Sequence, residues 1–262
     1  MTKLVSRQAE LEALLRSFHL TFFRSHYEQF ARQAEKEKLD HVAYLYQLCK
    51  LESDERYNRR TEKLIKQSKI PRGKLLSSFE FNRFEDLSES EVRQLSEGAF
   101  MDSSENILIF GNPGTGKSHL AAALGREWCL RGRTTFYTTA SALVQRLLIA
   151  KRDLKLNKVI KDLDAFEALI IDDISYVPQD RDETDVLFVL LAERYERRSL
   201  VITSNLQFSE WNLIFKDAVT TLAAIDKLVH HGHVLELNGE SYRAGVAEER
   251  KKRKNTSKPV RN

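Results

Sequence analysis

The sequence predicts an α/β fold, in which helices cover both faces of a mostly parallel sheet and a small helical domain precedes the sheet. Two observations support this prediction. From Asn106 onward, short apolar stretches alternate with segments of helix length, as in parallel strands joined by crossover helices. Before Pro71 the chain contains neither proline nor glycine, and apolar residues recur at helical spacing between residues 4 and 70.

Helical spacing defines the first domain, which we place at residues 1–72. The apolar positions that recur at this spacing are Leu11, Leu14, Leu15, Phe18, Phe22, Leu39, Val42, Leu45, Tyr46 and Cys49. Five aromatic residues could suggest stacking on nucleic-acid bases, namely Phe18, Phe22, Phe23, Tyr27 and Phe30. Because aromatic residues at helical spacing more commonly belong to a core, we expect them to be core residues.

The segment Pro71-Arg72-Gly73 ends the helical domain. Residues 73–100 then form a connector, whose polar and acidic stretch we expect to dock through its phenylalanines. The sheet domain occupies residues 101–245, with little or no helical lid after its last strand, and residues 246–262 form a basic, disordered tail. The expected strands are 107–110, 134–138, 168–171, 200–203 and 233–237, and the expected helices are 118–131, 140–151, 184–197 and 222–230.

Composition indicates a soluble protein. The 262 residues are 42% hydrophobic and 31% charged. The sequence shows no signal-type apolar core and no run near the ~18 apolar residues that a membrane span requires. Cys49 and Cys129 form no metal-like or CxxC pair, so we expect two reduced, partly buried thiols in the cytoplasm and no membrane partner.

Positive charge is concentrated in two places. Residues 250–262 hold seven Lys or Arg and no acid, so the remaining chain carries a net charge of 4 − 7 = −3. The segment from Glu55 to Lys74 holds eight basic residues against two acids. Both stretches suit a phosphate backbone, although a solvated tail and a solvated helix face would look the same.

An apolar stretch at 107–110 leads directly into the pattern G-x-x-x-x-G-K-[ST]. The residues of this loop are Gly111, Asn112, Pro113, Gly114, Thr115, Gly116, Lys117 and Ser118, and His119 follows them. A strand, a glycine-rich turn and a helix in this order predict a loop whose amides bind phosphates. Lys117 would reach the β- and γ-phosphates of ATP, and the Ser118 hydroxyl would ligate Mg²⁺. The alternative is a glycine-rich surface turn, which would need neither the strand before it nor the helix after it.

The strand expected at 168–171 closes with two acids, Asp172 and Asp173. In phosphate-loop proteins a neighbouring strand delivers one carboxylate to Mg²⁺, and a second acid can orient the attacking water. We assign Asp172 to the metal and Asp173 to the water, against the alternative of solvated acids at a strand end. Asn205 follows the next strand and could contact the γ-phosphate or the water, although Ser204-Asn205 also suits a simple turn.

Taken together, several segments of the sequence resemble the IstB family. These segments are the phosphate loop, Leu169 to Asp173, Val201 to Asn205, Ala224 to His231 and Gly239 to Arg243, and the similarity extends to Phe18–Tyr46. The family comprises helper ATPases of insertion sequences, which are relatives of DnaC-type helicase loaders in the AAA+ superfamily. The resemblance implies a P-loop AAA+ ATPase that uses ATP and Mg²⁺, assembles as a homo-oligomer with ATP between subunits, remodels double-stranded DNA and recruits a partner transposase.

The resemblance also assigns three further residues. It gives Asn205 the role of sensor 1 and Arg243 that of sensor 2. Where relatives carry an arginine that reaches the ATP of the neighbouring subunit, this chain has Lys227. Lysine lacks the planar fork of arginine, so hydrolysis could be slow, another arginine could serve, or Lys227 could be ordinary surface charge.

The cluster His230, His231 and His233 resembles a metal site. With no cysteine nearby and no carboxylate at ligand spacing, we expect these histidines to be packing or interface residues and not zinc ligands.

Two other classes of function share these motifs. A small-molecule kinase uses the same loop but needs an acceptor pocket and an arginine-bearing lid, and we find no segment of that kind. A helicase loader would bind a replicative helicase and prefer single-stranded DNA. Contacts to duplex DNA should be non-specific, because the basic stretches offer only backbone contacts.

Overall fold

The computed structural model describes residues 2–176, 181–215, 218–239 and 241–242. The chain divides into two units, Met1–Lys63 and Leu64–Asn262, and the boundary falls inside a long helix. No helix among these described residues is both long enough and apolar enough to span a lipid bilayer. The region beyond residue 242, where little or no helical lid was expected, and the basic tail lie outside the described residues.

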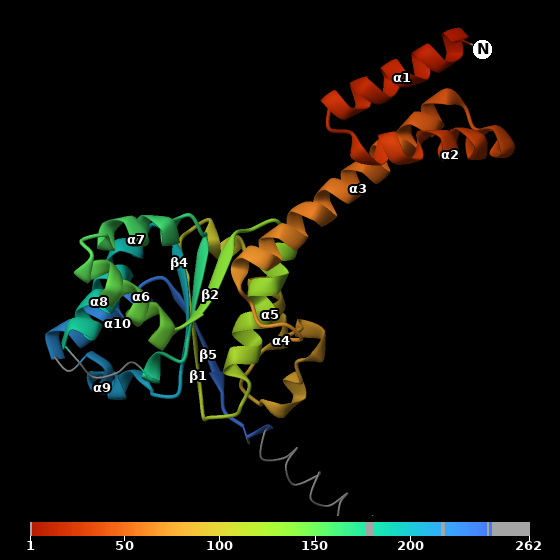
Figure 1. The fold of residues 1–262 in the computed structure, drawn as a ribbon. Helices are drawn as coiled ribbons and strands as arrows, with labels where there is room; N and C mark the ends of the chain where they lie inside the picture. The colour runs from red at the N-terminus through yellow and green to blue at the C-terminus, as the bar shows by residue number, and fades with distance from the viewer. Residues whose placement is uncertain (1, 177–180, 216–217, 240, 243–262) are drawn as a thin grey trace, which may run out of the picture. The chain divides into compact units, whose positions relative to one another are not determined.

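Three helices build the N-terminal unit: α1 (Thr2–Ser17), α2 (Thr21–Glu37) and α3 (His41–Ser68), which continues into the second unit (Figure 1). The helical prediction for this region is therefore confirmed. Lys38 ends α2 in a left-handed conformation, with φ of 56°. Asp40 then caps α3, because its carboxylate accepts the backbone N–H of Ala43 at 2.7 Å.

The prediction that the aromatic residues of this unit are core residues is wrong for Phe18, which is 64% exposed. Leu14 and Leu45 are also exposed, whereas Leu15 and Leu48 are buried. Each helix of a three-helix unit buries one stripe against its neighbours, so apolar residues outside that stripe stay in water. The other four aromatic residues are partly buried: Phe22, Phe23, Tyr27 and Phe30.

A buried acid, Glu52, joins α3 to the start of α2. Its Oε2 accepts the backbone N–H groups of Phe22 at 2.7 Å and Phe23 at 3.4 Å, and its Oε1 accepts from Arg56 Nε at 2.8 Å. Burial alone would raise the pKa of Glu52, but the bonds from Arg56 and the two amides lower it overall. Glu52 thus satisfies helix-end amides that α2 leaves without a side-chain cap of its own.

The two cysteines differ in environment. Both are free, and Cys129 is buried beside Thr135, where burial raises the pKa of its thiol. Cys49 is exposed, which corrects the expectation that both thiols are partly buried.

Five parallel strands form the sheet of the second unit. They are β1 (Asn106–Gly111), β2 (Thr135–Thr139), β3 (Ala168–Asp172), β4 (Ser199–Ser204) and β5 (Gly232–Leu237). Their order is β2-β3-β4-β1-β5, and every pairing is parallel. All five strands were predicted within two residues of these bounds.

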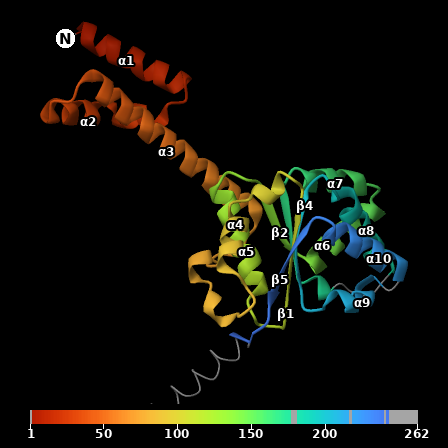
Figure 2. The same ribbon diagram turned by 180° about the vertical axis from the view of Figure 1, so that it is seen from behind.

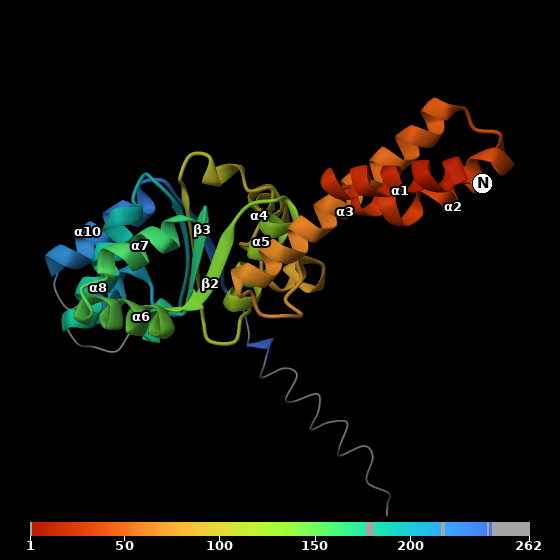
Figure 3. The same cartoon turned by 45° about the horizontal axis from the view of Figure 1, so that its top comes forward.

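Helices cover both faces of the sheet, as predicted (Figures 1 and 2). One face carries α4 (Glu89–Ser96) and α5 (Lys117–Leu130), and the other carries α6 (Ala140–Arg152), α8 (Arg181–Arg194) and α10 (Ala218–Val229). Figure 3 shows α5 and α6 on opposite sides of β2 and β3. The sequence analysis missed α4, α7 (Leu156–Asp164) and α9 (Asn212–Phe215).

Side chains of β1 alternate between the two helical layers. Leu108 and Phe110 enter the core with α6, α8 and α10, while Ile107 and Ile109 enter the core with α4 and α5. Because both faces are covered, the strand reads as a continuous apolar run.

The connector docks through its phenylalanines, as expected. Phe79 and Phe84 are buried in the same core as α4 and α5. Ser88 caps α4 by accepting the N–H of Glu91 at 3.3 Å. The indole N–H of Trp128 donates to the Leu95 carbonyl at 2.8 Å and fixes α4 against α5.

A fully buried arginine ties three segments of this unit together. Arg194, near the end of α8, donates to the carbonyls of Leu163, Phe166 and Ser199 at 3.0 to 3.1 Å and to the Asp164 carboxylate at 3.3 Å. Burial lowers the pKa of its guanidinium to about 10, which leaves it charged at neutral pH.

Replacing Arg194 should therefore destabilise the sheet unit strongly. We expect Arg194→Ala to lower the free energy of unfolding by about 3–5 kcal/mol, because three carbonyls and a carboxylate lose their buried donor. The matched control is Arg197→Ala, since Arg197 pairs with the same Asp164 from a side chain that is 59% exposed and should cost at most about 1 kcal/mol. Urea unfolding measures both, and equal losses would contradict the assignment.

Candidate nucleotide-binding site

The phosphate-loop sequence forms the turn between β1 and α5. Gly114 and Gly116 adopt φ of 85° and 112°, in the region that favours glycine. At Gly111 a Cβ atom would lie 2.6 Å from the Leu237 carbonyl oxygen, so the loop also needs glycine where β5 approaches it. α5 begins at Lys117 with no side-chain cap, which leaves its first amides directed at the loop for an anion.

Lys117 lies inside this loop and is only 7% exposed. Its ammonium donates to the carbonyl of Gly111 at 2.7 Å and to that of Asn112 at 2.9 Å. The loop therefore concentrates one ammonium and several amides, a set of donors suited to a phosphate chain.

The two acids that close β3 have different environments. The Asp172 carboxylate is buried and accepts the hydroxyl of Tyr137 on β2 and that of Thr203 on β4, each at 2.6 Å. Burial, with the Asp172 and Asp173 charges, raises the pKa of Tyr137 strongly, so Tyr137 is the proton donor of this pair.

Asp173 follows β3 in a left-handed conformation, with φ of 61°. Its backbone N–H donates to Thr203 Oγ1 at 2.8 Å, and its Oδ1 accepts from Asn205 Nδ2 at 3.3 Å. Asn205 is held in turn by Ser175, whose Oγ accepts the Asn205 backbone N–H at 2.9 Å. The ends of β3 and β4 thus place a carboxylate and an amide side by side.

A cavity of about 550 Å³ joins these groups, and its volume lies in the usual range for small-molecule sites. The predicted residues that line it are Pro113, Gly114, Thr115, Gly116, Lys117, Ser118, His119, Asp173 and Asn205. Gly111, Asn112 and Asp172 are not among the residues that line it. The described part of the structure ends before Arg243, so that residue is not placed.

The cavity has a second, aromatic end that sequence reasoning missed. The lining residues there are Lys74, Ser78, Phe79, Glu80, Arg83, Phe84 and Tyr242. Thr203 also lines the cavity, at the sheet edge beside Asp173. His119 packs edge-on against Phe79, with ring centroids 5.7 Å apart. The phenylalanines of the connector were the only sequence signal for this end of the cavity. They predicted that the connector docks on the sheet domain, but not that Phe79 would reach the phosphate loop.

Lys227 lies away from this cavity. It is near the end of α10, and its backbone carbonyl and that of Leu228 accept from Asn106, the first residue of β1. Its ammonium is 4.5 Å from the centroid of the Tyr195 ring. Lys227 is therefore at the amino-terminal edge of the sheet, whereas the phosphate loop is at the carboxyl-terminal edge.

The sheet order, the phosphate loop and the acidic strand end define a P-loop ATPase of the AAA+ class. The fold agrees with AMPPCP-bound DnaA from Aquifex aeolicus, with a TM-score of 0.55, 19% identity and coverage of 73% of this chain and 58% of that one. It also agrees with DnaI, with a TM-score of 0.54, 17% identity and coverage of 64% and 94%.

The sequence comparisons identify the family. Residues 13–252 match the family of IstB-like ATP binding proteins, and the chain belongs to this family. It is 42% identical to an insertion-sequence ATP-binding protein of Sinorhizobium fredii, over 94% of this chain and 83% of the relative. It is 36% identical to the ATP-binding protein of insertion sequence IS21 from Pseudomonas aeruginosa, over 89% and 88%.

Proposed function

We propose that this protein is an ATP-dependent assembly factor that binds and remodels target duplex DNA and recruits a partner transposase in the cytoplasm. The observation that carries the proposal is the convergence of the phosphate loop, Asp173 and Asn205 on one cavity of a chain whose relatives are encoded by insertion sequences. A kinase would need an acceptor site, and the cavity's second end is aromatic, which suits a base instead.

The loop residues hold the triphosphate in this proposal. The amides of Gly114 to Ser118 and the Lys117 ammonium bind the phosphates, and the aromatic end formed by Phe79 and His119 takes the adenine. A flexible lysine held by loop carbonyls can exchange those partners for phosphate oxygens without leaving the loop.

Ser118 and Asp172 are the residues that would hold Mg²⁺. A hydroxyl and a carboxylate are hard oxygen donors of the kind this ion prefers. Ser118 lines the cavity, and Asp172 directly precedes Asp173, which also lines it. When bound, Mg²⁺ neutralises charge on the phosphates. Tyr137 and Thr203 donate to the Asp172 carboxylate and would hold it in position for the ion.

Asp173 and Asn205 act on the water in this scheme. Asp173 accepts a proton from the attacking water, and Asn205 holds the carboxylate in place while reaching toward the γ-phosphate. Thr203 fixes the backbone turn that directs Asp173 into the cavity.

A cation from a second subunit completes the site. Lys227 lies at the opposite edge of the sheet from its own cavity, so it can serve only a neighbour's ATP, and Arg243 is the other candidate. In this proposal ATP lies between subunits, and nucleotide binding favours the homo-oligomer.

In this proposal the protein binds duplex DNA through contacts between basic side chains and the DNA phosphates. Basic residues on the second half of α3 are exposed and recur on successive helical turns, and they include Arg56, Arg59, Arg60, Lys63 and Lys66. With the basic tail, this face binds DNA without reading its sequence.

The proposal is tested by measuring assembly on duplex DNA with a non-hydrolysable ATP analogue. We expect wild-type protein to assemble only with analogue and duplex together, and Lys117→Ala to lose nucleotide binding and assembly because the phosphates lose their main cation. Lys158→Ala, an exposed lysine outside the cavity, is the control and should assemble normally. Preference for single-stranded DNA would favour a helicase loader, and turnover independent of DNA and protein concentration would favour a kinase.

Substitution of Asp173 should lower ATP turnover without preventing assembly. We expect Asp173→Asn to lower ATP turnover by about 10²-fold or more, because the water loses its proton acceptor, with nucleotide affinity and assembly retained. Asparagine tolerates the left-handed backbone at this position better than alanine does. Phosphate release and fluorescent-nucleotide binding measure the two effects, with the exposed Asp153→Asn as control. Unchanged turnover would exclude the proposed role.

Tyr137 should affect the apparent affinity of the site for Mg²⁺. We expect Tyr137→Phe to raise the Mg²⁺ concentration needed for half-maximal turnover by about 10-fold or more, because Asp172 loses one of the two hydroxyls that orient it. Tyr46→Phe, on an exposed tyrosine of the N-terminal unit, is the matched control. A Tyr137→Phe protein with lower thermal stability but an unchanged Mg²⁺ dependence would show a purely structural role.

A further inference from the structure

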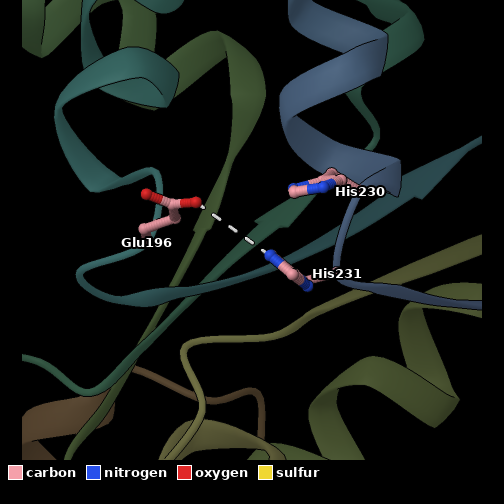
Figure 4. A group of neighbouring side chains, drawn as sticks. All are labelled: Glu196, His230 and His231. Atoms are coloured by element: carbon pink, nitrogen blue, oxygen red, sulfur yellow. Dashed lines mark ion pairs between the residues drawn. The ribbon is translucent and has the colours of Figure 1, made fainter.

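The histidines near the end of the sequence are arranged differently from the sequence expectation. No carboxylate lies at ligand spacing along the chain, but Glu196, two residues after the end of α8, lies beside His230 and His231 (Figure 4). His233 is not part of this group, because its Nε2 pairs with Glu105 Oε2 at 2.9 Å. The three residues are exposed, so a packing role does not account for His230 and His231.

The ligand atoms of this group are close together. Glu196, His230 and His231 each offer one atom, and these atoms all lie within 4.8 Å of one another. His231 Nε2 is 4.0 Å from Glu196 Oε1, and the two imidazole centroids are 4.0 Å apart. A tetrahedral zinc ion needs ligand atoms about 3.4 Å apart, which small rotations of exposed side chains would achieve.

Backbone contacts fix the positions from which these side chains extend. The His230 N–H donates to Asp226 O at 3.0 Å, which holds His230 directly after the end of α10. The His231 carbonyl accepts the Asn106 N–H at 2.7 Å, which ties it to the start of β1. Glu196 adopts φ of 56° where the chain leaves α8. Only side-chain freedom is therefore lost when an ion binds.

Tyr195 supplies an outer partner for the group. Its hydroxyl is 3.0 Å from His230 Nδ1. A hydrogen bond of this kind holds an imidazole in a fixed orientation, as the outer partners of metal-ligating histidines do.

We propose that Glu196, His230 and His231 form a binding site for a divalent transition-metal ion of the zinc class, at the amino-terminal edge of the sheet and separate from the nucleotide cavity. Two imidazoles and one carboxylate suit Zn²⁺ and not Mg²⁺ or Ca²⁺, which prefer oxygen-only ligands. The fourth position is open to water or to a donor from another molecule. Lys227, whose ammonium lies 4.5 Å from the centroid of the Tyr195 ring, opposes metal binding by its charge.

The test is Zn²⁺ titration of the full chain, without an affinity tag, against a chromophoric chelator. The chain carries Cys49→Ser, because an exposed thiol would itself bind zinc. We expect one Zn²⁺ per chain, and at least about 10-fold weaker binding in His230→Ala, His231→Ala and Glu196→Gln. Tyr195→Phe should weaken binding by about 10-fold through the loss of the outer hydrogen bond.

His233→Ala is the matched control, since it removes a histidine from the same segment but outside the group. It should bind Zn²⁺ as the parent does, and circular dichroism confirms that every variant is folded. Substituting Co²⁺ gives an independent readout, since the intensity of its visible absorption reports tetrahedral coordination and should fall in His231→Ala. Unchanged Zn²⁺ affinity in His231→Ala, or an equal loss in His233→Ala, would overturn the proposal.

Discussion

The carboxylate of Asp172 is buried at the end of β3, and a buried carboxylate is tolerated only when donors surround it. Tyr137 from β2 and Thr203 from β4 provide those donors at 2.6 Å each, so three adjacent strands are joined at the carboxyl edge of the sheet. The Thr203 hydroxyl also accepts the N–H of Asp173 and so fixes the turn that carries the second carboxylate toward Asn205. Much of the site's geometry is therefore set by the sheet itself.

A different constraint shapes the phosphate loop: backbone and side-chain groups approach its own backbone closely. Gly111 lies against the Leu237 carbonyl. The Lys117 ammonium donates to the carbonyls of Gly111 and Asn112, at the start of the same loop. The loop supplies donors for an anion, and the carboxylate of Asp173 lines the same cavity. Groups of opposite charge therefore meet at one site, as binding of a triphosphate with its cation requires.

The features that local sequence determines were predicted correctly. A buried parallel strand must be a short apolar run, and a phosphate loop must have glycines at fixed spacing, so β1 and the loop could be identified without knowledge of the fold. Tyr137 could not be identified as a partner of Asp172, because that contact depends on the order of strands that lie far apart in sequence. Phe18 was placed wrongly for a related reason: helical spacing shows that a face is apolar, but not whether another element covers it.

The polarity of a parallel sheet explains why Lys227 lies far from the nucleotide cavity of its own chain. All five strands point the same way, so the loop and Asp173 collect at one edge while the start of β1, the end of α10 and Lys227 collect at the other. A neighbour's triphosphate that approaches Lys227 would also meet Tyr195 and the group formed by Glu196 and His230. A divalent ion there would offset the Glu196 charge and add positive potential beside Lys227, so the two proposals meet at one subunit edge and predict that metal would strengthen its attraction for phosphate.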